Sequence, residues 1–194
     1  MNALMNPVTA AAGIVSHPLF DTQALESWLA DPENREGQVR VRLIEPDDLE
    51  REREFVNGLS AQTSYLRLMS ARKPTDEELQ RWTRIDRSRE GALVATVVSE
   101  GRERQVGVAR YVLDGPEGQA DFAVVVADEW QGEGLGKRLI LALIDLARES
   151  GVKHLLGSAM SDNRRMLALA RRLGFRLSKE PGAATITNVS LSLQ

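Results

Sequence analysis

The 194-residue sequence predicts a mixed α/β domain in which helices pack on a central sheet. Three strand-like segments separated by tight turns indicate an antiparallel meander in the first half of the chain. A long helix with a leucine face then follows a glycine-rich turn. Strand and helix segments alternate again after that helix, so both element types contribute to one fold.

The first half opens with a strand-like alternation at residues 39–44. Pro46 starts a helix that ends near Gly58, because proline suits the first turn of a helix and glycine its end. Thr75 and Glu78 form a capping-box pattern at the start of another helix. The other elements expected in this half are a helix over 59–69, the body of the capped helix over 75–85, and strands over 92–98, 105–112 and 119–127.

The second half is built around one amphipathic helix. Leu135, Leu139, Leu143 and Leu146 share one of its faces, and Gly151 ends it. The elements expected after it are a strand over 153–160, a helix capped by Ser161 or Asp162 and running to Leu173, and a final strand over 184–193.

The amino-terminal segment is patterned differently from the rest. Residues 1–38 show poor periodicity and are expected to form an extension, with the domain spanning 39–194. Residues 3–20 are mildly apolar, but polar residues and prolines interrupt them and no Lys or Arg precedes them, unlike a secretion signal. No stretch reaches the roughly 18 apolar residues of a membrane span. The sequence therefore predicts a cytoplasmic protein with no membrane partner.

Composition narrows the chemistry. The chain has 25 Lys and Arg against 28 Asp and Glu, a net charge of −3, which argues against a nucleic-acid partner. It has no cysteine, so no thiolate nucleophile and no cysteine-ligated metal are available. His17 and His154 are far apart and neither has a second ligand at helical spacing, so no metal site is expected.

The most informative segment joins the strand over 119–127 to the leucine-faced helix. It contains Gly132, Gly134 and Gly136, three alternate glycines at the start of that helix. Glycines let the backbone approach a ligand, and helix-terminal N–H groups attract anions, so the turn suits a phosphate. The spacing fits neither a Walker A loop, which needs Gly-Lys-Ser/Thr, nor the Gly-x-Gly-x-x-Gly dinucleotide motif.

The segment Gln131-x-x-Gly134-x-Gly136 resembles the signature of the GNAT acetyltransferases, and residues 163–175 resemble the Asn-plus-Gly-Phe helix of the same superfamily. Together with residues 120–126, these blocks are similar to the acetyltransferase domain of bacterial Pat-type protein lysine acetyltransferases. The resemblance implies a mostly antiparallel sheet with helices on both faces, and acetyl-CoA as acyl donor. The donor-binding residues that it implies are Val125, Gln131, Gly132, Glu133, Gly134, Leu135, Gly136, Lys137, Arg138 and Asn163.

Several of these residues have a simpler alternative role. Lys137 and Arg138 could neutralise phosphate or merely form a solvated helix face, and Glu133 could face solvent. Asn163 could bind the pantetheine arm or cap its helix. The backbone N–H of Val125 or of a neighbour is expected to polarise the thioester carbonyl, as in the family.

The resemblance implies a general base at Asp121, where the lysine acetyltransferases carry Glu. Strand alternation places Asp121 on the face of Ala123 and Val125, where small apolar neighbours would raise the pKa of its carboxyl. Its alternative role is an ion pair with Arg110 on an adjacent strand. Ala170 occupies the position of the family's acid Tyr, so water is expected to protonate the leaving thiolate.

The resulting hypothesis is an acetyl-CoA-dependent N-acetyltransferase in which an amine attacks the thioester directly. Protein lysine is the preferred acceptor and a small-molecule amine is the alternative. An acyl-CoA-binding module without useful turnover is a further alternative, because both the acid and the base positions depart from the family. A homodimer is left open.

Overall fold

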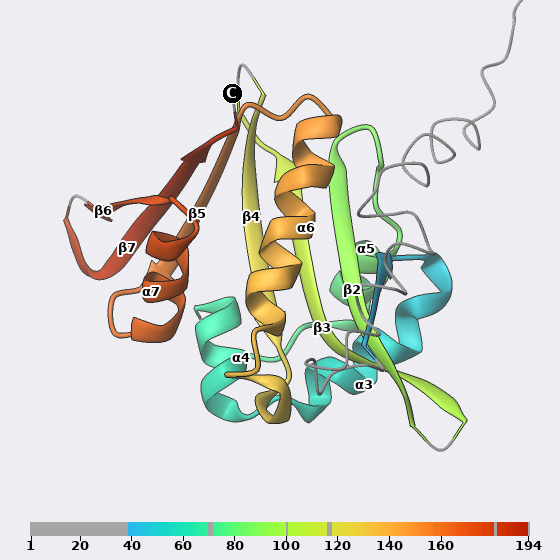
Figure 1. Ribbon diagram of the computed structural model, residues 1–194. Helices are drawn as coiled ribbons and strands as arrows, with labels where there is room; N and C mark the ends of the chain where they lie inside the picture. The colour runs from blue at the N-terminus through green and yellow to red at the C-terminus, as the bar shows by residue number, and fades with distance from the viewer. Residues whose placement is uncertain (1–38, 70–71, 100, 116–117, 181, 194) are drawn as a thin grey trace, which may run out of the picture.

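The computed structural model describes residues 39–193 except 70–71, 100, 116–117 and 181, so the expected extension over 1–38 lies outside the described residues (Figure 1). The described part contains one seven-stranded sheet in the order β1-β2-β3-β4-β5-β7-β6. Its only parallel pair is β4 with β5, so the sheet is mostly antiparallel. The strands are β1 (Arg40–Leu43), β2 (Glu90–Ser99), β3 (Arg102–Leu113), β4 (Gln119–Val126), β5 (His154–Met160), β6 (Arg176–Glu180) and β7 (Ala183–Ser192).

Helices cover both faces of this sheet, which confirms the predicted α/β class (Figure 1). One face carries α6, whose leucines share a core with Phe122 of β4 and Leu167 of α7. The opposite face carries α3, where Phe55 packs against Val94 and Val125. The helices are η1 (Pro46–Asp48), α3 (Leu49–Gly58), α4 (Ala61–Leu68), α5 (Asp76–Thr83), η2 (Asp128–Trp130), α6 (Leu135–Glu149) and α7 (Arg164–Arg172). No described helix is long and apolar enough to cross a membrane.

The leucine-faced helix is α6, as the periodicity predicts. Leu135, Leu139 and Leu143 are fully buried, and Leu146 is nearly so. At roughly 25 cal/mol per Å² of apolar surface, such side chains contribute about 2 kcal/mol each to the fold. Their burial holds the first turn of α6 firmly against the sheet, and the glycine loop leads into that turn.

Strands β4 and β5 pair over a short stretch and then separate. Their three paired positions are 119 with 154, 120 with 155 and 121 with 156. Beyond Leu156, β5 pairs only with β7 among the described strands, while β4 continues along β3. The two halves of the sheet therefore separate after Asp121 and leave a wedge-shaped gap between β4 and β5.

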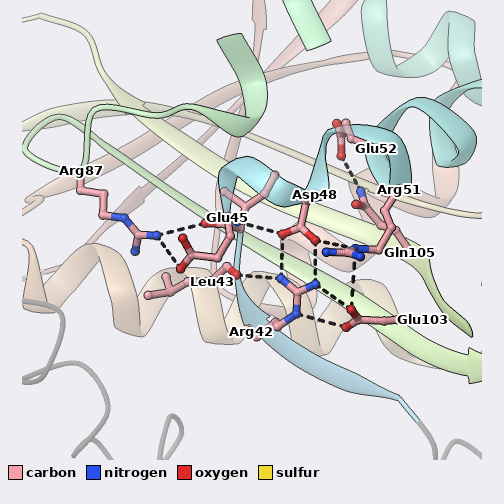
Figure 2. Close-up of polar contacts among 10 residues, drawn as sticks. Arg42, Leu43, Glu45, Asp48, Arg51, Glu52, Arg87, Glu103 and Gln105 are labelled. Atoms are coloured by element: carbon pink, nitrogen blue, oxygen red, sulfur yellow. Dashed lines mark hydrogen bonds and ion pairs between the residues drawn. The ribbon is translucent and has the colours of Figure 1, made fainter. Parts of the chain in front are cut away.

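A polar network fastens α3 beneath β1 and β3 (Figure 2). Arg42 donates two hydrogen bonds of 2.7 Å to the carboxylate of Asp48, whose side chain is fully buried. Arg42 also donates to both carboxylate oxygens of Glu103 at 3.1 Å, and Arg51 donates to Asp48 at 2.6 Å. This network ties the start of α3 to the sheet and so supports the helices that follow it.

Three details differ from the sequence prediction. The strand β6 was not predicted, because its residues Arg176–Glu180 contain a single apolar side chain, Leu177. Residues 46–48 form a short 3-10 helix before α3 instead of its first turn. The cap of α7 is Asn163 rather than Ser161 or Asp162, since its side chain accepts the backbone N–H of Met166.

Candidate active site

The gap between β4 and β5 opens into a cleft of about 1340 Å³. Its walls come from β4, β5, the glycine loop and two helices, α4 and α7. Its lining combines the apolar middle of β4 with charged side chains of α4 and α7, including Arg67, Arg164, Arg165 and Arg172. A long ligand with an uncharged stem and an anionic end would match this distribution of apolar and cationic surface.

The glycine loop forms one end of the cleft. Gly132 and Gly134 have φ angles of +91° and +90°, which side-chain-bearing residues rarely adopt, and a Cβ added at either would meet no atom within 4 Å. Gly136 lies in the first turn of α6. A Cβ atom at this position would lie 3.6 Å from the side chain of Leu169. The open space over the loop and the unpaired N–H groups of the first turn of α6 suit an anion.

Residues before the loop hold it against α4. The side chain of Gln131 donates to the carbonyl of Val126 at 3.0 Å and to the hydroxyl of Thr63 at 3.2 Å. Asp128 accepts from the hydroxyls of Ser60 and Thr63, both at 2.7 Å. Gln131 therefore lines the cleft and also positions the loop, a structural role that its place in the motif did not reveal.

The structure separates the predicted donor-binding residues into two groups. Those that line the cleft are Val125, Gln131, Gly132, Gly134, Gly136, Lys137 and Asn163. Three do not line it: Glu133 is exposed, Leu135 is fully buried in the core, and Arg138 is partly buried. The side chain of Leu135 belongs to the core, so any contact of this residue with the donor would be through its backbone N–H at the start of α6.

Helix α7 supplies cations that sequence reasoning missed. Arg164, Arg165 and Arg172 line the cleft, on the helix capped by Asn163. Arg164 and Arg165 belong to the Asn-Arg-Arg segment of the motif and Arg172 lies at the other end of the helix, but only the fold shows that α7 faces the cleft. The side chain of Asn163 lines the cleft while it caps α7, so both of its expected roles are compatible with its position.

The hydrogen bonds of β4 indicate which of its backbone N–H groups is directed toward the cleft. Ala127 donates its N–H to Val106 of β3, whereas the carbonyl of Val126 accepts from Gln131 on the open side. Because backbone groups alternate in direction along a strand, the N–H of Val125 is directed toward β3. The N–H of the neighbouring Val124 is directed toward the cleft and is the better candidate to polarise a thioester carbonyl.

Asp121 lies at the closed end of the wedge, at the last position where β4 pairs with β5. It lines a groove of about 650 Å³ beside the cleft, whereas Ala123, two residues further on the same face, lines the cleft itself. Two strand residues span roughly 7 Å. Asp121 is exposed, and partial desolvation, with the negative charge of Asp114 as a second cause, raises the pKa of its carboxyl.

Asp121 is not paired with Arg110, the alternative that the sequence left open. Arg110 instead donates to the buried Glu52 at 3.1 Å and to the backbone carbonyl of Trp82 at 3.2 Å. In register, Arg110 is opposite Ala123 rather than Asp121. Ala170, at the position of the family's acid, is fully buried in the core. It has no proton to donate, so the leaving thiolate must take its proton from another source.

Arg67 is a further cleft residue that the sequence analysis did not identify. Arg67, near the end of α4, lines the cleft, and its guanidinium carbon lies 5.0 Å from the centre of the Trp82 ring. Because these residues lie on different helices, no local pattern predicts their contact. Within the part of the chain that the structure describes, no group of three His, Asp or Glu residues is arranged to hold a metal ion.

Comparison with proteins of known sequence gives one family. The family model described as acetyltransferase (GNAT) family matches residues 59–175. Acetyltransferase PA5475 of Pseudomonas aeruginosa is 36% identical over 148 residues, 76% of this chain and 80% of that protein. Acetyltransferase Pat of Mycolicibacterium smegmatis is 31% identical over 78% of this chain, and the match spans 45% of Pat. The L-methionine sulfoximine/L-methionine sulfone acetyltransferase of P. aeruginosa is 34% identical over 47% of this chain and 55% of that enzyme.

Solved structures agree on the fold. The GNAT domain of S. lividans PAT superposes with a TM-score of 0.73 at 23% identity, covering 82% of this chain and 93% of that one. YncA of Salmonella typhimurium, solved with acetyl-CoA, gives a TM-score of 0.65 at 21% identity, covering 80% and 94%. The family match, the relatives and the shared fold lead to one conclusion: this chain is a member of the GNAT family of acetyltransferases.

Proposed function

We propose that this chain transfers the acetyl group of acetyl-CoA to a primary amine, with Asp121 as the base that removes the amine's proton. The observation that carries the proposal is the wedge between β4 and β5, which has the glycine loop at its mouth and Asp121 at its closed end. In this arrangement the glycine loop and the cations of α7 would hold the phosphates of acetyl-CoA. The thioester would then lie along the middle of β4.

The amine and the base would meet where the groove joins the cleft. A lysine ammonium with a pKa of about 10.4 is neutral only about once in 2,500 at pH 7, so a base must take a proton before attack. The amine nitrogen then bonds to the thioester carbonyl carbon and the C–S bond breaks. Asp121 takes the first ammonium proton, directly or through a water, and releases it to solvent. The second proton, which the nitrogen loses as the amide forms, passes through solvent to the CoA thiolate.

For the acceptor we propose protein lysine. The groove beside Asp121 is open and lined by charged side chains, including Arg84, Arg89 and Asp114, which suits a polar chain segment better than a small apolar molecule. The resemblance of residues 120–126 and of the glycine loop to Pat-type protein lysine acetyltransferases supports the same choice. A small amine is the second candidate, supported by the similarity to the L-methionine sulfoximine/L-methionine sulfone acetyltransferase and by Arg67, a cation in the cleft wall.

The test is acetyl-CoA turnover by the wild type and three variants, measured on a panel of proteins and small amines. Asp121→Asn should retain its affinity for acetyl-CoA and lose about 10² to 10⁴ in turnover at neutral pH. Its deficit should shrink as the pH approaches about 10, where the acceptor amine loses its proton unaided. Asp121→Glu should keep much of the rate, and Asp47→Asn, at an exposed position of η1, is the matched control.

Equal rates for the wild type and Asp121→Asn across this pH range would remove Asp121 from the mechanism. Tight acetyl-CoA binding with no turnover on any amine would instead favour an acyl-CoA-binding module.

A further inference from the structure

Arg67 is a cation in the cleft wall without an acidic partner among the described residues. Its guanidinium contacts the Trp82 ring at 5.0 Å, and Arg110 lies 5.3 Å from the centre of the same ring. The nearby carboxylate, Glu52, is hydrogen-bonded to Arg110 at 3.1 Å. Two guanidinium groups therefore contact one ring, and the one buried carboxylate near them is hydrogen-bonded to Arg110.

Such an arrangement has an energetic cost that a ligand can offset. Burial, and secondarily the charge of Arg110, lowers the pKa of Arg67 to about 10, so the side chain stays charged at neutral pH. A desolvated charge is costly unless it is paired, and stacking on Trp82 returns only about 1 to 2 kcal/mol. An anion brought into the cleft would complete the pairing.

The position of Arg67 decides which ligand could bring that anion. Thr63, one helical turn earlier on α4, is bonded to Gln131 at the glycine loop. Arg67 lies about 6 Å further along the helix, beside Trp82 and Arg110, and Arg110 is opposite Ala123 in the sheet. Arg67 is therefore next to the reacting end of the cleft. The pantetheine arm that would pass here is uncharged, and the phosphates of CoA would lie at the loop.

We propose that Arg67 is an acceptor subsite that binds a carboxylate which the acceptor carries close to the amine to be acetylated. This inference rests on the proposed acetyl transfer, because only that reaction brings an acceptor to the middle of β4. Two acceptors offer this chemistry: a free amino acid with its α-carboxylate, and a peptide with an acidic side chain beside the acceptor lysine.

The experiment compares matched acceptor pairs that differ only in the carboxylate. The small pair is L-methionine and L-methioninamide, and the peptide pair carries Lys followed by Glu or by Gln. We expect the ratio of kcat/KM for acid over amide to fall at least tenfold in Arg67→Gln relative to the wild type, or about 1.4 kcal/mol. Arg67→Lys should retain part of the preference. The KM for acetyl-CoA should stay unchanged in both variants.

The ratio comparison cancels differences in amine basicity, because both proteins receive the same acceptors. Arg148→Gln, in the last turn of α6, is the matched control and should leave every ratio unchanged. The melting temperature of Arg67→Gln should equal or exceed that of the wild type, since the variant removes a charge without a described acidic partner. A response in one pair alone identifies which acceptor supplies the carboxylate.

Unchanged ratios in both pairs, with turnover intact, would overturn the subsite while leaving the acetyltransferase proposal standing. If no acceptor is turned over, calorimetric binding of N-acetyl-L-methionine and of the acetylated peptide in the presence of CoA decides the matter. Weaker binding to Arg67→Gln than to the wild type would support the subsite. Equal binding, or none to either protein, would reject it.

Discussion

Both carboxylate oxygens of Asp128 accept hydrogen bonds from Ser60, one from its backbone N–H at 2.9 Å and one from its hydroxyl at 2.7 Å. The two residues are 68 positions apart, and their contact joins the start of α4 to the segment that leads into the glycine loop. Burial alone would raise the pKa of Asp128, but these hydrogen bonds and the one from Thr63 lower it. The contact therefore ties two walls of the cleft, α4 and the segment before the glycine loop, to each other.

Removal of this contact should loosen the donor site. In Asp128→Ala the cap residue Ser60 loses the carboxylate that accepts from its N–H and hydroxyl, and Thr63 loses one of the two partners that position it beside Gln131. We expect the KM for acetyl-CoA to rise several-fold with a smaller change in kcat, measured in steady-state assays. Glu129→Ala, the adjacent exposed carboxylate, is the control. A change in kcat alone would show that Asp128 does not act through donor binding.

Gly134→Leu should block the glycine loop. The substitution forces a branched side chain into a φ of +90° and places it in the open space over the loop. Affinity for acetyl-CoA should fall at least tenfold, or about 1.4 kcal/mol, in a calorimetric titration. Gly101→Leu, at a φ of +75° in the turn between β2 and β3, carries comparable backbone strain away from the cleft and should bind normally. Equal affinities of the two folded variants would contradict the assignment.

Asp114 should tune the pH dependence of the reaction. Its negative charge contributes to the raised pKa of Asp121, so Asp114→Asn should lower that pKa. A base acts in its ionised form, and the acid limb of the kcat profile should therefore move to lower pH. Steady-state kcat between pH 5 and 9 on the best acceptor measures this shift. An acid limb that stays in place, or moves to higher pH, would separate Asp121 from the titration.

Asp48 should make the fold acid-sensitive. Burial alone would raise its pKa, but hydrogen bonds from Arg42, the Glu45 backbone and Arg51 lower it from 3.8 to about 2. A carboxyl whose pKa is lower in the folded state stabilises the fold at pH values above its unfolded-state pKa. For this shift the stabilisation is about 2 kcal/mol, and about half of it is lost by pH 3. Asp48→Asn should therefore unfold about 2 kcal/mol more easily in urea at pH 7.

The difference in the free energy of unfolding between Asp48→Asn and the wild type should become smaller as the pH falls below 4. Asp76→Asn, whose side chain is 75% exposed and paired with Arg53, should change stability by less than about 0.5 kcal/mol. A gap for Asp48→Asn that is constant with pH would show that the carboxylate charge is not what stabilises this network.

The parts of the fold that the sequence predicts are those with a local signal. The helix α6 has a continuous apolar face, α5 has both halves of its capping box, and the meander β2 to β4 has alternating residues between turns. The glycine loop is likewise a local pattern, and its position at the start of α6 follows from it. These elements can be predicted because each carries its signal within its own residues.

The parts that it does not predict depend on distant contacts. β6 is a mostly polar edge strand, recognisable only by its pairing with β7. The stack of Arg67 on Trp82 joins two helices, and Arg110 reaches the same ring from a strand. The direction of the Val125 N–H depends on the register with β3. Neither the choice between the N–H groups of Val125 and its neighbour Val124 nor the position of Arg67 is encoded in nearby residues.

The short pairing of β4 with β5 has one more consequence. A strand that is paired on one side only offers its other row of N–H and C=O groups to whatever molecule comes beside it, as an outer edge strand does. Here that row lies in the middle of the sheet, along β4 after Asp121. A slender molecule with amide groups, such as the pantetheine arm, could occupy the gap as a surrogate strand, so that the ligand would complete the sheet it enters.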